Sequence, residues 1–373
     1  MGTTAFGLND ALAVKLWSKK LAAEATKALD IAPLFGEGTG SVIQIKTETS
    51  KGPGDSITFG LRMQLSGNGF TSSDRAEGNG EQLTTNSDKV SIDELGHVVG
   101  VRSKNTIDQQ RIPFDLREES RAGLADWFQL RTSVTFFNHV CGNTAANFVQ
   151  VDGSGGLKFT GNNVVVAPTR VVRPNGKAND GALVAPVNGA GGDIMTLDLI
   201  DAAVEIAKTG GNAGDIKMRP VKVAGMGEMW VMYLHSTQVT QLRRNTAQGQ
   251  WFDIQKAAIQ GGQVTKNPIF DGSLGVYNNV VLRESQQVTM GVAADGRTVI
   301  PTVRRAVLLG AQAATAAFGK GGGEGKYRWN EELYDHKREL EVSAWSIWGM
   351  KKTAYNGRDF AAIVIPTYAV NAG

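Results

Sequence analysis

The sequence predicts an α+β fold on three observations. Positions 57–65 alternate between apolar and small or polar residues, which is the period of a half-buried β-strand. Positions 123–141 carry apolar residues at alternating spacings of four and three, which indicates one long amphipathic helix. The 46 glycines and the 20% share of charged residues indicate many turns and extended segments. A largely helical protein is therefore disfavoured, and 373 residues suffice for two or three domains.

A first helix is expected to end near Ala32, and a long hairpin should follow it. The outgoing strand of this hairpin carries apolar residues at every odd position, while the return arm is less regular and the segment between them is rich in glycine. An isolated two-stranded ribbon is only marginally stable in water. We therefore expect an identical subunit to cover its apolar face. The residues expected to make this inter-subunit contact are Ile57, Phe59, Leu61, Met63 and Leu65.

A long helix should begin directly after the hairpin. Asp115 is placed to cap it, and Glu118 is the matching residue of a capping box. Its stripe ends at the chain's single cysteine. The pattern fits a spine against which sheets pack, and it fits an ordinary core helix of an unrelated α+β domain equally well. The residues expected to pack are Trp127, Leu130, Val134, Phe137 and Cys141.

Residues 143–192 shift in composition towards Gly, Asn, Val and Ala, which predicts an inserted, irregular surface excursion with short strands such as 163–166. A compact α/β unit should follow. It begins with a helix from Thr196 to a stop at Gly210 and continues with a buried strand, 229–234, and a second helix capped by Ser236. After the glycine-rich linker 319–325, the last segment is rich in strands and aromatic residues.

Composition excludes several classes of protein. One cysteine rules out a disulfide framework and favours folding in a reducing cytoplasm. Neither a signal peptide nor a membrane-spanning stretch is expected. The net charge of +3 is too small for a dedicated nucleic-acid binder, although weak contact with nucleic acid stays open.

Candidate chemistry is weak throughout the chain. Residues 291–298 resemble a phosphate-binding loop, but Arg297 stands where that motif needs lysine, and a strand follows instead of a helix. The four histidines lack the spacing of a metal site, and no serine lies in a nucleophile elbow. The basic pairs 243–244, 304–305 and 351–352 could touch phosphates, but isolated pairs are usually solvated. We expect no enzyme activity, no cofactor and no metal.

Six segments also carry a family resemblance. In chain order they are ALAVKLWSKKL (11–21), SKGPGD (50–55), GLRMQL (60–65), NPIFDGSLGVYN (267–278), SIWGMKK (346–352) and NGRDFA (356–361). They are similar to segments of tailed-bacteriophage major capsid proteins, in the branch related to the coliphage N-four capsid protein. Together they extend along most of the chain except residues 143–195.

The resemblance implies the fold shared by tailed-phage and herpesvirus capsids. On that mapping residues 1–49 form an N-terminal arm, 50–101 an extended hairpin loop, 102–142 a peripheral domain with the spine helix, 143–192 an insertion, 193–320 an α/β axial domain, and 321–373 a return to the peripheral domain.

The implied function is self-assembly into hexamers and pentamers of an icosahedral shell. That shell would be built in the host bacterial cytoplasm and become part of the virion. The implied partners are further copies of the chain, double-stranded DNA held by weak non-specific contacts, and portal, scaffolding or decoration proteins. An encapsulin-like compartment, a soluble α/β enzyme and a nucleic-acid-binding module are the alternatives.

Overall fold

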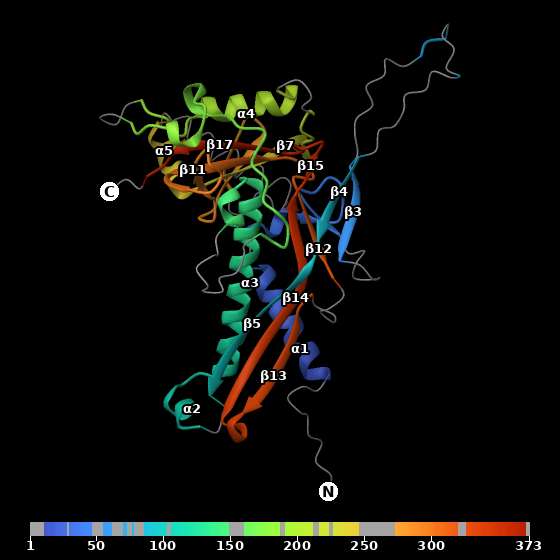
Figure 1. The fold of residues 1–373 in the computed structure, drawn as a ribbon, viewed down its shortest axis with the longest axis vertical. Helices are drawn as coiled ribbons and strands as arrows, with labels where there is room; N and C mark the ends of the chain where they lie inside the picture. The colour runs from blue at the N-terminus through green and yellow to red at the C-terminus, as the bar shows by residue number, and fades with distance from the viewer. Residues whose placement is uncertain are drawn as a thin grey trace.

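The computed structural model of the chain describes residues 11–27, 30–46, 55–61, 70–72, 77, 86–102, 106–148, 160–186, 191–211, 216–223, 227–245, 273–319 and 326–370. These residues form an elongated molecule with a broad upper part and a narrower lower part (Figure 1). Each part is built on its own sheet. The helices are α1 (Ala11–Lys27), α2 (Ile107–Arg111), α3 (Leu116–Val140), α4 (Leu197–Thr209) and α5 (Ser236–Asn245).

A six-stranded sheet forms the lower part. Its order is β1-β2-β12-β14-β13, and β5 pairs with the long central strand β14. The β1–β2 and β2–β12 pairs are parallel, whereas β14 runs antiparallel to its three partners. The strands are β1 (Phe35–Gly36), β2 (Ile43–Lys46), β5 (Asp93–Arg102), β12 (Ala314–Phe318), β13 (Arg328–Tyr334) and β14 (Glu339–Lys352).

A seven-stranded sheet forms the upper part, beside α4 and α5 (Figure 1). Its order is β10-β11-β7-β9-β8, with β17 paired to β11 and β6 paired to β7. The strands are β6 (Val221–Val223), β7 (Gly227–Leu234), β8 (Ser273–Tyr277), β9 (Val280–Glu284), β10 (Met290–Val292), β11 (Val299–Leu309) and β17 (Ala362–Tyr368). Two small ribbons complete the fold, β3 (Ser56–Leu61) with β4 (Asn86–Ser91) and β15 (Ala354–Tyr355) with β16 (Arg358–Asp359).

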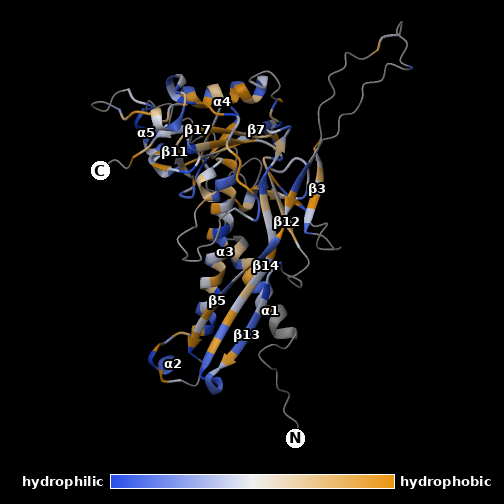
Figure 2. Cartoon of the chain, in the orientation of Figure 1, coloured by the Kyte–Doolittle hydropathy of each residue, from blue (hydrophilic) through white to orange (hydrophobic). Residues whose placement is uncertain are grey.

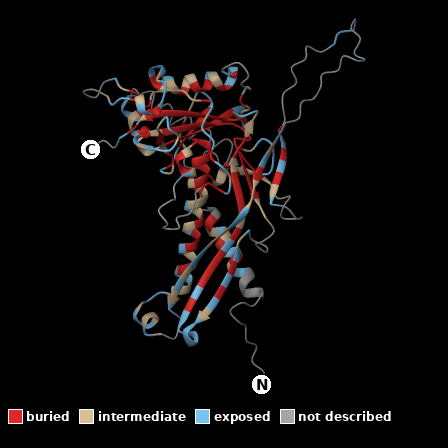
Figure 3. Cartoon of the chain, in the orientation of Figure 1, coloured by how far each residue is buried: buried red, intermediate tan, exposed pale blue. Residues whose placement is uncertain are grey.

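The two sheets differ in how far their strands are buried, and the hydropathy of the strands explains this difference. Apolar residues gather in the central strands of the upper sheet, as Figure 2 shows, and six of the seven residues of β17 are buried. In β13, buried and exposed residues alternate over most of the strand, so this strand has one covered face and one open face (Figure 3). The lower sheet therefore presents a face that the described residues do not fully cover.

The sequence-based boundaries need correction at three places. β1 and β2, expected in a separate N-terminal arm, are strands of the lower sheet. β12 falls in the range expected for the axial unit but also belongs to the lower sheet, and β17 leaves the returning segment to join the upper sheet. These strands are largely buried, and pairing inside a sheet satisfies their backbone groups where water is absent.

The described part of the 143–192 segment is irregular, as composition predicts, but it lies against the body of the chain. Residues 163–166 form no strand, and the segment's described part is tied to the body of the chain. Asn163 exchanges two hydrogen bonds with the Ser91 backbone, at 2.9 and 3.0 Å. The Val172 N–H donates to the Val364 carbonyl at 2.9 Å, beside β17. Because many such bonds are made by side chains or single backbone groups, no strand period marks them in the sequence.

Candidate assembly surfaces

The base of the hairpin packs within its own chain. Ile57, Phe59 and Leu61 are only 3%, 4% and 2% exposed and belong to the main hydrophobic core. The Lys46 ammonium lies 5.5 Å from the centre of the Phe59 ring. These three side chains are therefore already covered within the single chain. Met63 and Leu65 lie outside the described residues.

Polar contacts fix the position of the hairpin base. On β4, the Asp88 carboxylate accepts hydrogen bonds from the Lys351 ammonium and, at 3.0 Å, from the Ala354 N–H. Lys351 also donates to the Lys89 carbonyl at 3.3 Å. Lys351 lies just before the end of β14 and Ala354 lies in β15, so these bonds fix the hairpin base (β3 and β4) to the body of the chain.

The spine helix α3 begins as predicted. Asp115 is its N-cap, and the Asp115 carboxylate accepts from the Arg117 N–H at 3.0 Å. Phe137 and Cys141 are fully buried, whereas Trp127 and Val134 are half-buried. The expected packing is wrong at Leu130, which is 43% exposed.

The buried face of α3 rotates because the helix passes through two cores. Its first half packs Leu124, Ala125 and Phe128 into a small core that also contains Leu21 of α1. Its last turns contribute to the main core instead, where the Phe137 ring meets Tyr233 edge-on at 5.3 Å. One straight stripe cannot describe a helix with two sets of neighbours.

Helix α1 docks on α3 and β13 through aromatic and charged groups. Trp17 stacks on Trp329 at 5.6 Å, and the Arg117 guanidinium lies 4.7 Å from the Trp17 ring. The buried Glu331 carboxylate accepts from Arg117 at 2.7 Å and from the Trp329 indole at 2.7 Å. The N-terminal helix is therefore held on the spine in the single chain.

The open face of the lower sheet carries an apolar strip of Trp345 and Val98. The Trp345 ring lies directly over Gly96 of the neighbouring strand, where an added Cβ atom would stand 2.2 Å from it. Trp345 is 36% exposed, and Val98 is 44% exposed. Glu341, whose side chain is exposed, lies on the same strand four residues before Trp345. We call this face of β5, β14 and β13 the outer face.

A buried ion-pair cluster joins the spine to the upper sheet. The Asp180 carboxylate contacts Arg305 at 2.7 Å and Arg173 at 3.1 Å. Arg305 also donates to the carbonyls of Cys141 and Gly142, at 3.2 and 2.7 Å. Asp180 therefore neutralises charge at the point where α3 ends against β11, and Arg305 is not one of the surface cations that could meet phosphate.

The remaining basic pairs divide by exposure. Lys352 is buried and contacts Asp359 at 2.6 Å, and Lys351 is held by Asp88. Arg243 and Arg244, in the last turn of α5, are exposed. Of the three pairs singled out in the sequence, the Arg243–Arg244 pair lies where an anion in solution can reach it.

Residues 291–298 form a turn between β10 and β11. The Asp295 carboxylate accepts from the N–H groups of Arg297 and Thr298, at 2.9 and 3.0 Å, and from the Thr298 hydroxyl at 2.6 Å. These bonds lower the pKa of Asp295 to about 2. A carboxylate thus occupies the donors that a phosphate loop would offer to its ligand.

Two histidines have clear structural roles. The His139 ring donates to the Thr160 carbonyl at 2.7 Å, and burial lowers the pKa of His139 to about 4. His235, rather than the expected Ser236, caps α5, because its ring nitrogen accepts from the Thr237 N–H at 3.3 Å. Burial and Arg304 together lower the pKa of His235 to about 4.

The described residues hold no group of three or more potential metal ligands. Over the same parts of the chain, none of the helices has the length and apolar character needed to cross a membrane. Burial raises the pKa of the Cys141 thiol to about 11, so this cysteine is a core residue and not a nucleophile.

Comparison with known proteins agrees with this structural reading. The family model described as phage capsid protein matches residues 5–371, so the chain belongs to the phage capsid protein family. The capsid of Ralstonia phage GP4 is similar at 29% identity and a TM-score of 0.73, with all of both chains covered. The search of curated proteins finds no match.

More distant structures share the fold. The cyanophage Pam1 capsid is 20% identical over 93% of this chain and 94% of that one, with a TM-score of 0.63. The head of Helicobacter pylori bacteriophage KHP40 is 17% identical over 90% of each chain, with a TM-score of 0.57. The expected tailed-phage capsid fold is confirmed, and the chain is a major capsid protein with a non-enzymatic role in an icosahedral shell. The narrower N-four branch stays a prediction.

Proposed function

We propose that the chain assembles into hexamers and pentamers, and that the hairpin of each subunit lies over the outer face of its neighbour. The observation that carries this proposal is the apolar strip of Trp345 and Val98 on a sheet whose other face is packed. A head-to-tail contact of this kind closes into rings, and rings join into a shell.

The hairpin supplies the complementary part from residues beyond its anchored base. Ile57, Phe59 and Leu61 hold the base in its own subunit. Met63 and Leu65 continue the same odd-numbered apolar series further along the chain. We assign the inter-subunit contact to these two residues, with Trp345 as the residue that receives them.

A weak contact between hairpin and outer face is sufficient for assembly, because it is repeated in every subunit. Each pairing of one hairpin with one outer face can be weak, because a closed shell engages every subunit through several neighbours at once. The shell encloses double-stranded DNA in this proposal. The small net charge of +3 favours weak, sequence-independent contact with it, for which Arg243 and Arg244 are the exposed pair. Assembly takes place in the host cytoplasm, with scaffolding, portal or decoration proteins as further partners.

Substitution at both sides of the contact tests the proposal. Trp345→Glu and Met63→Asp should each give folded subunits that do not close into shells, because each places a charge in an apolar contact. Trp345→Phe and Met63→Leu are the matched controls and should assemble. Gel filtration and negative-stain electron microscopy give the readout, with circular dichroism as the check of folding. Normal shells from either charged variant would show that the hairpin does not dock on the outer face.

A further inference from the structure

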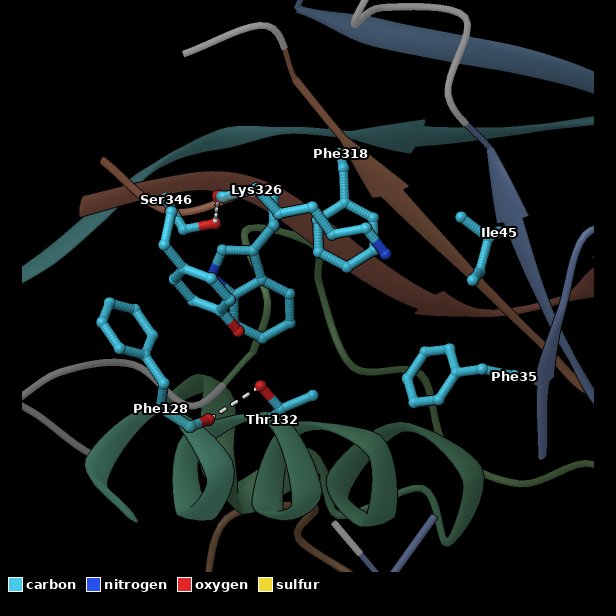
Figure 4. A pocket seen from close by; sticks show the side chains of 9 residues that line it. Phe35, Ile45, Phe128, Thr132, Phe318, Lys326 and Ser346 are labelled. Carbon is cyan, nitrogen blue, oxygen red and sulfur yellow. Dashed lines mark hydrogen bonds between the residues drawn. The ribbon is translucent and has the colours of Figure 1, made fainter. Parts of the chain in front are cut away.

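A small cavity lies between α3 and the lower sheet, on the side opposite the outer face. Its volume is about 90 Å³, and five aromatic rings line most of it (Figure 4). Phe128 reaches it from α3, and Phe318 and Trp348 reach it from β12 and β14. The remaining two rings belong to Phe35 and Tyr327.

Two hydroxyl groups beside the cavity are hydrogen-bonded, whereas one buried indole is not. The Thr132 hydroxyl donates to the Phe128 carbonyl at 2.8 Å, and the Ser346 hydroxyl donates to the Lys326 carbonyl at 2.8 Å (Figure 4). The indole N–H of Trp348 is buried and has no hydrogen-bond partner among the described residues. A buried donor without an acceptor is costly, and nearly all such groups in proteins are paired.

The one charged group in the lining is held by an aromatic ring. The Lys326 ammonium lies 4.2 Å from the centre of the Phe318 ring, so the face of that ring engages it. Burial lowers the pKa of Lys326, and the charge of Glu37 opposes this only in part. The Lys326 ammonium is thus engaged within the chain, and the Trp348 indole is the group that a ligand would satisfy.

We propose that this cavity binds a small uncharged molecule that combines an apolar body with one hydrogen-bond acceptor for the Trp348 indole. Because aromatic rings make up most of the lining, an apolar body gains more here than a water molecule, which when buried typically needs two to four polar partners. Apolar cavities of roughly 150 Å³ are known to take benzene. A cavity of about 90 Å³ suits a molecule smaller than benzene, such as a three- or four-carbon ketone or alkene.

Occupancy would tighten the packing of α3 on the sheet, since the ligand would contact both. The site is separate from the hairpin contact. Trp348 and Trp345 lie on opposite faces of β14, three positions apart on a strand whose faces alternate. Filling the cavity is thus a way to stabilise the subunit without touching the assembly surface.

Acetone and isobutene are a matched pair of small probes, because the two differ only in a carbonyl oxygen against a methylene group. Titration of each into the full chain, followed by thermal shift and ligand-observed NMR, should show both binding. The ketone should bind about three- to tenfold more tightly, which corresponds to one net hydrogen bond. Failure of both probes to bind would overturn the proposal.

Variants identify the site. Trp348→Phe should abolish the preference for the ketone while both probes still bind, and Trp345→Phe should leave the preference unchanged. Thr132→Leu should fill the cavity and block both probes, and Ile45→Phe provides a second filling variant if Thr132→Leu fails to fold. A preference for the ketone that survives in Trp348→Phe would show that the indole is not its donor. Undiminished binding in a folded filling variant would show that the probes bind elsewhere.

Discussion

Removing one partner of the buried Lys352–Asp359 pair should strongly destabilise the subunit. The two side chains are 3% and 2% exposed and lie 2.6 Å apart. Lys352→Met keeps most of the side-chain volume but leaves the Asp359 carboxylate with the Thr169 N–H, at 2.9 Å, as its remaining contact outside the small β15–β16 ribbon. Breaking a buried pair in this way costs about 3–5 kcal/mol, a large part of a typical stability of about 5–15 kcal/mol.

The double variant separates the cost of an orphaned charge from the value of the pair. Lys352→Met with Asp359→Asn removes both charges and keeps an oxygen that accepts from Thr169. It should recover most of the loss, because replacing both members of a buried pair is often nearly neutral. Arg338→Met is the control, since its pairing with Asp335 is exposed and should contribute less than about 1 kcal/mol.

Urea unfolding of the unassembled subunit, followed by circular dichroism, measures these free energies. A loss below about 1 kcal/mol for Lys352→Met would show that the pair does not behave as a buried one, since this is the value expected of an exposed pair. So would a double variant that unfolds as readily as the single one.

Three further changes probe other parts of the chain. Phe59→Ala should cost about 3–5 kcal/mol in urea unfolding, because the ring is buried in the chain's own core, and a loss below about 1 kcal/mol would place that ring at an open surface. Gly96→Ala should cost about 1–3 kcal/mol and reduce shell yield, because the new methyl group displaces the Trp345 ring; unchanged stability and yield would contradict this contact. The buried His139 ring takes up a proton near pH 4 when folded and near pH 6.5 when unfolded, so its contribution to stability falls by about 3 kcal/mol as pH drops through that window. His139→Gln should remove this part of the pH dependence in unfolding measured from pH 7 to 4, and an unchanged slope would argue against a neutral buried ring.

Local signals in the sequence predicted the elements well. Asp115 caps α3, and α4 ends at Gly210, whose positive φ of 97° suits glycine. The alternating apolar residues of β3 correctly indicated a strand with one covered face. Each of these features depends on residues close together in the chain.

The residues that pack against each apolar face could not be predicted in the same way. Alternation at Ile57, Phe59 and Leu61 shows that a cover is needed, but it does not say whether the cover comes from the same chain or from another. The Asp180–Arg305 pair joins residues 125 positions apart, and no local pattern marks it. The outer face was missed because its central feature, Trp345 lying over Gly96, depends on the pairing register of two distant strands.

Copies of this chain should form a closed shell in which the hairpin of one subunit covers the outer face of the next. Cryo-electron microscopy of shells assembled from the full chain, with its phage's scaffolding protein where assembly requires it, tests this most directly. We expect an icosahedral shell of hexamers and pentamers in which Met63 and Leu65 of a neighbouring copy contact Trp345. A shell in which Trp345 faces solvent, or in which the hairpin lies elsewhere, would contradict it.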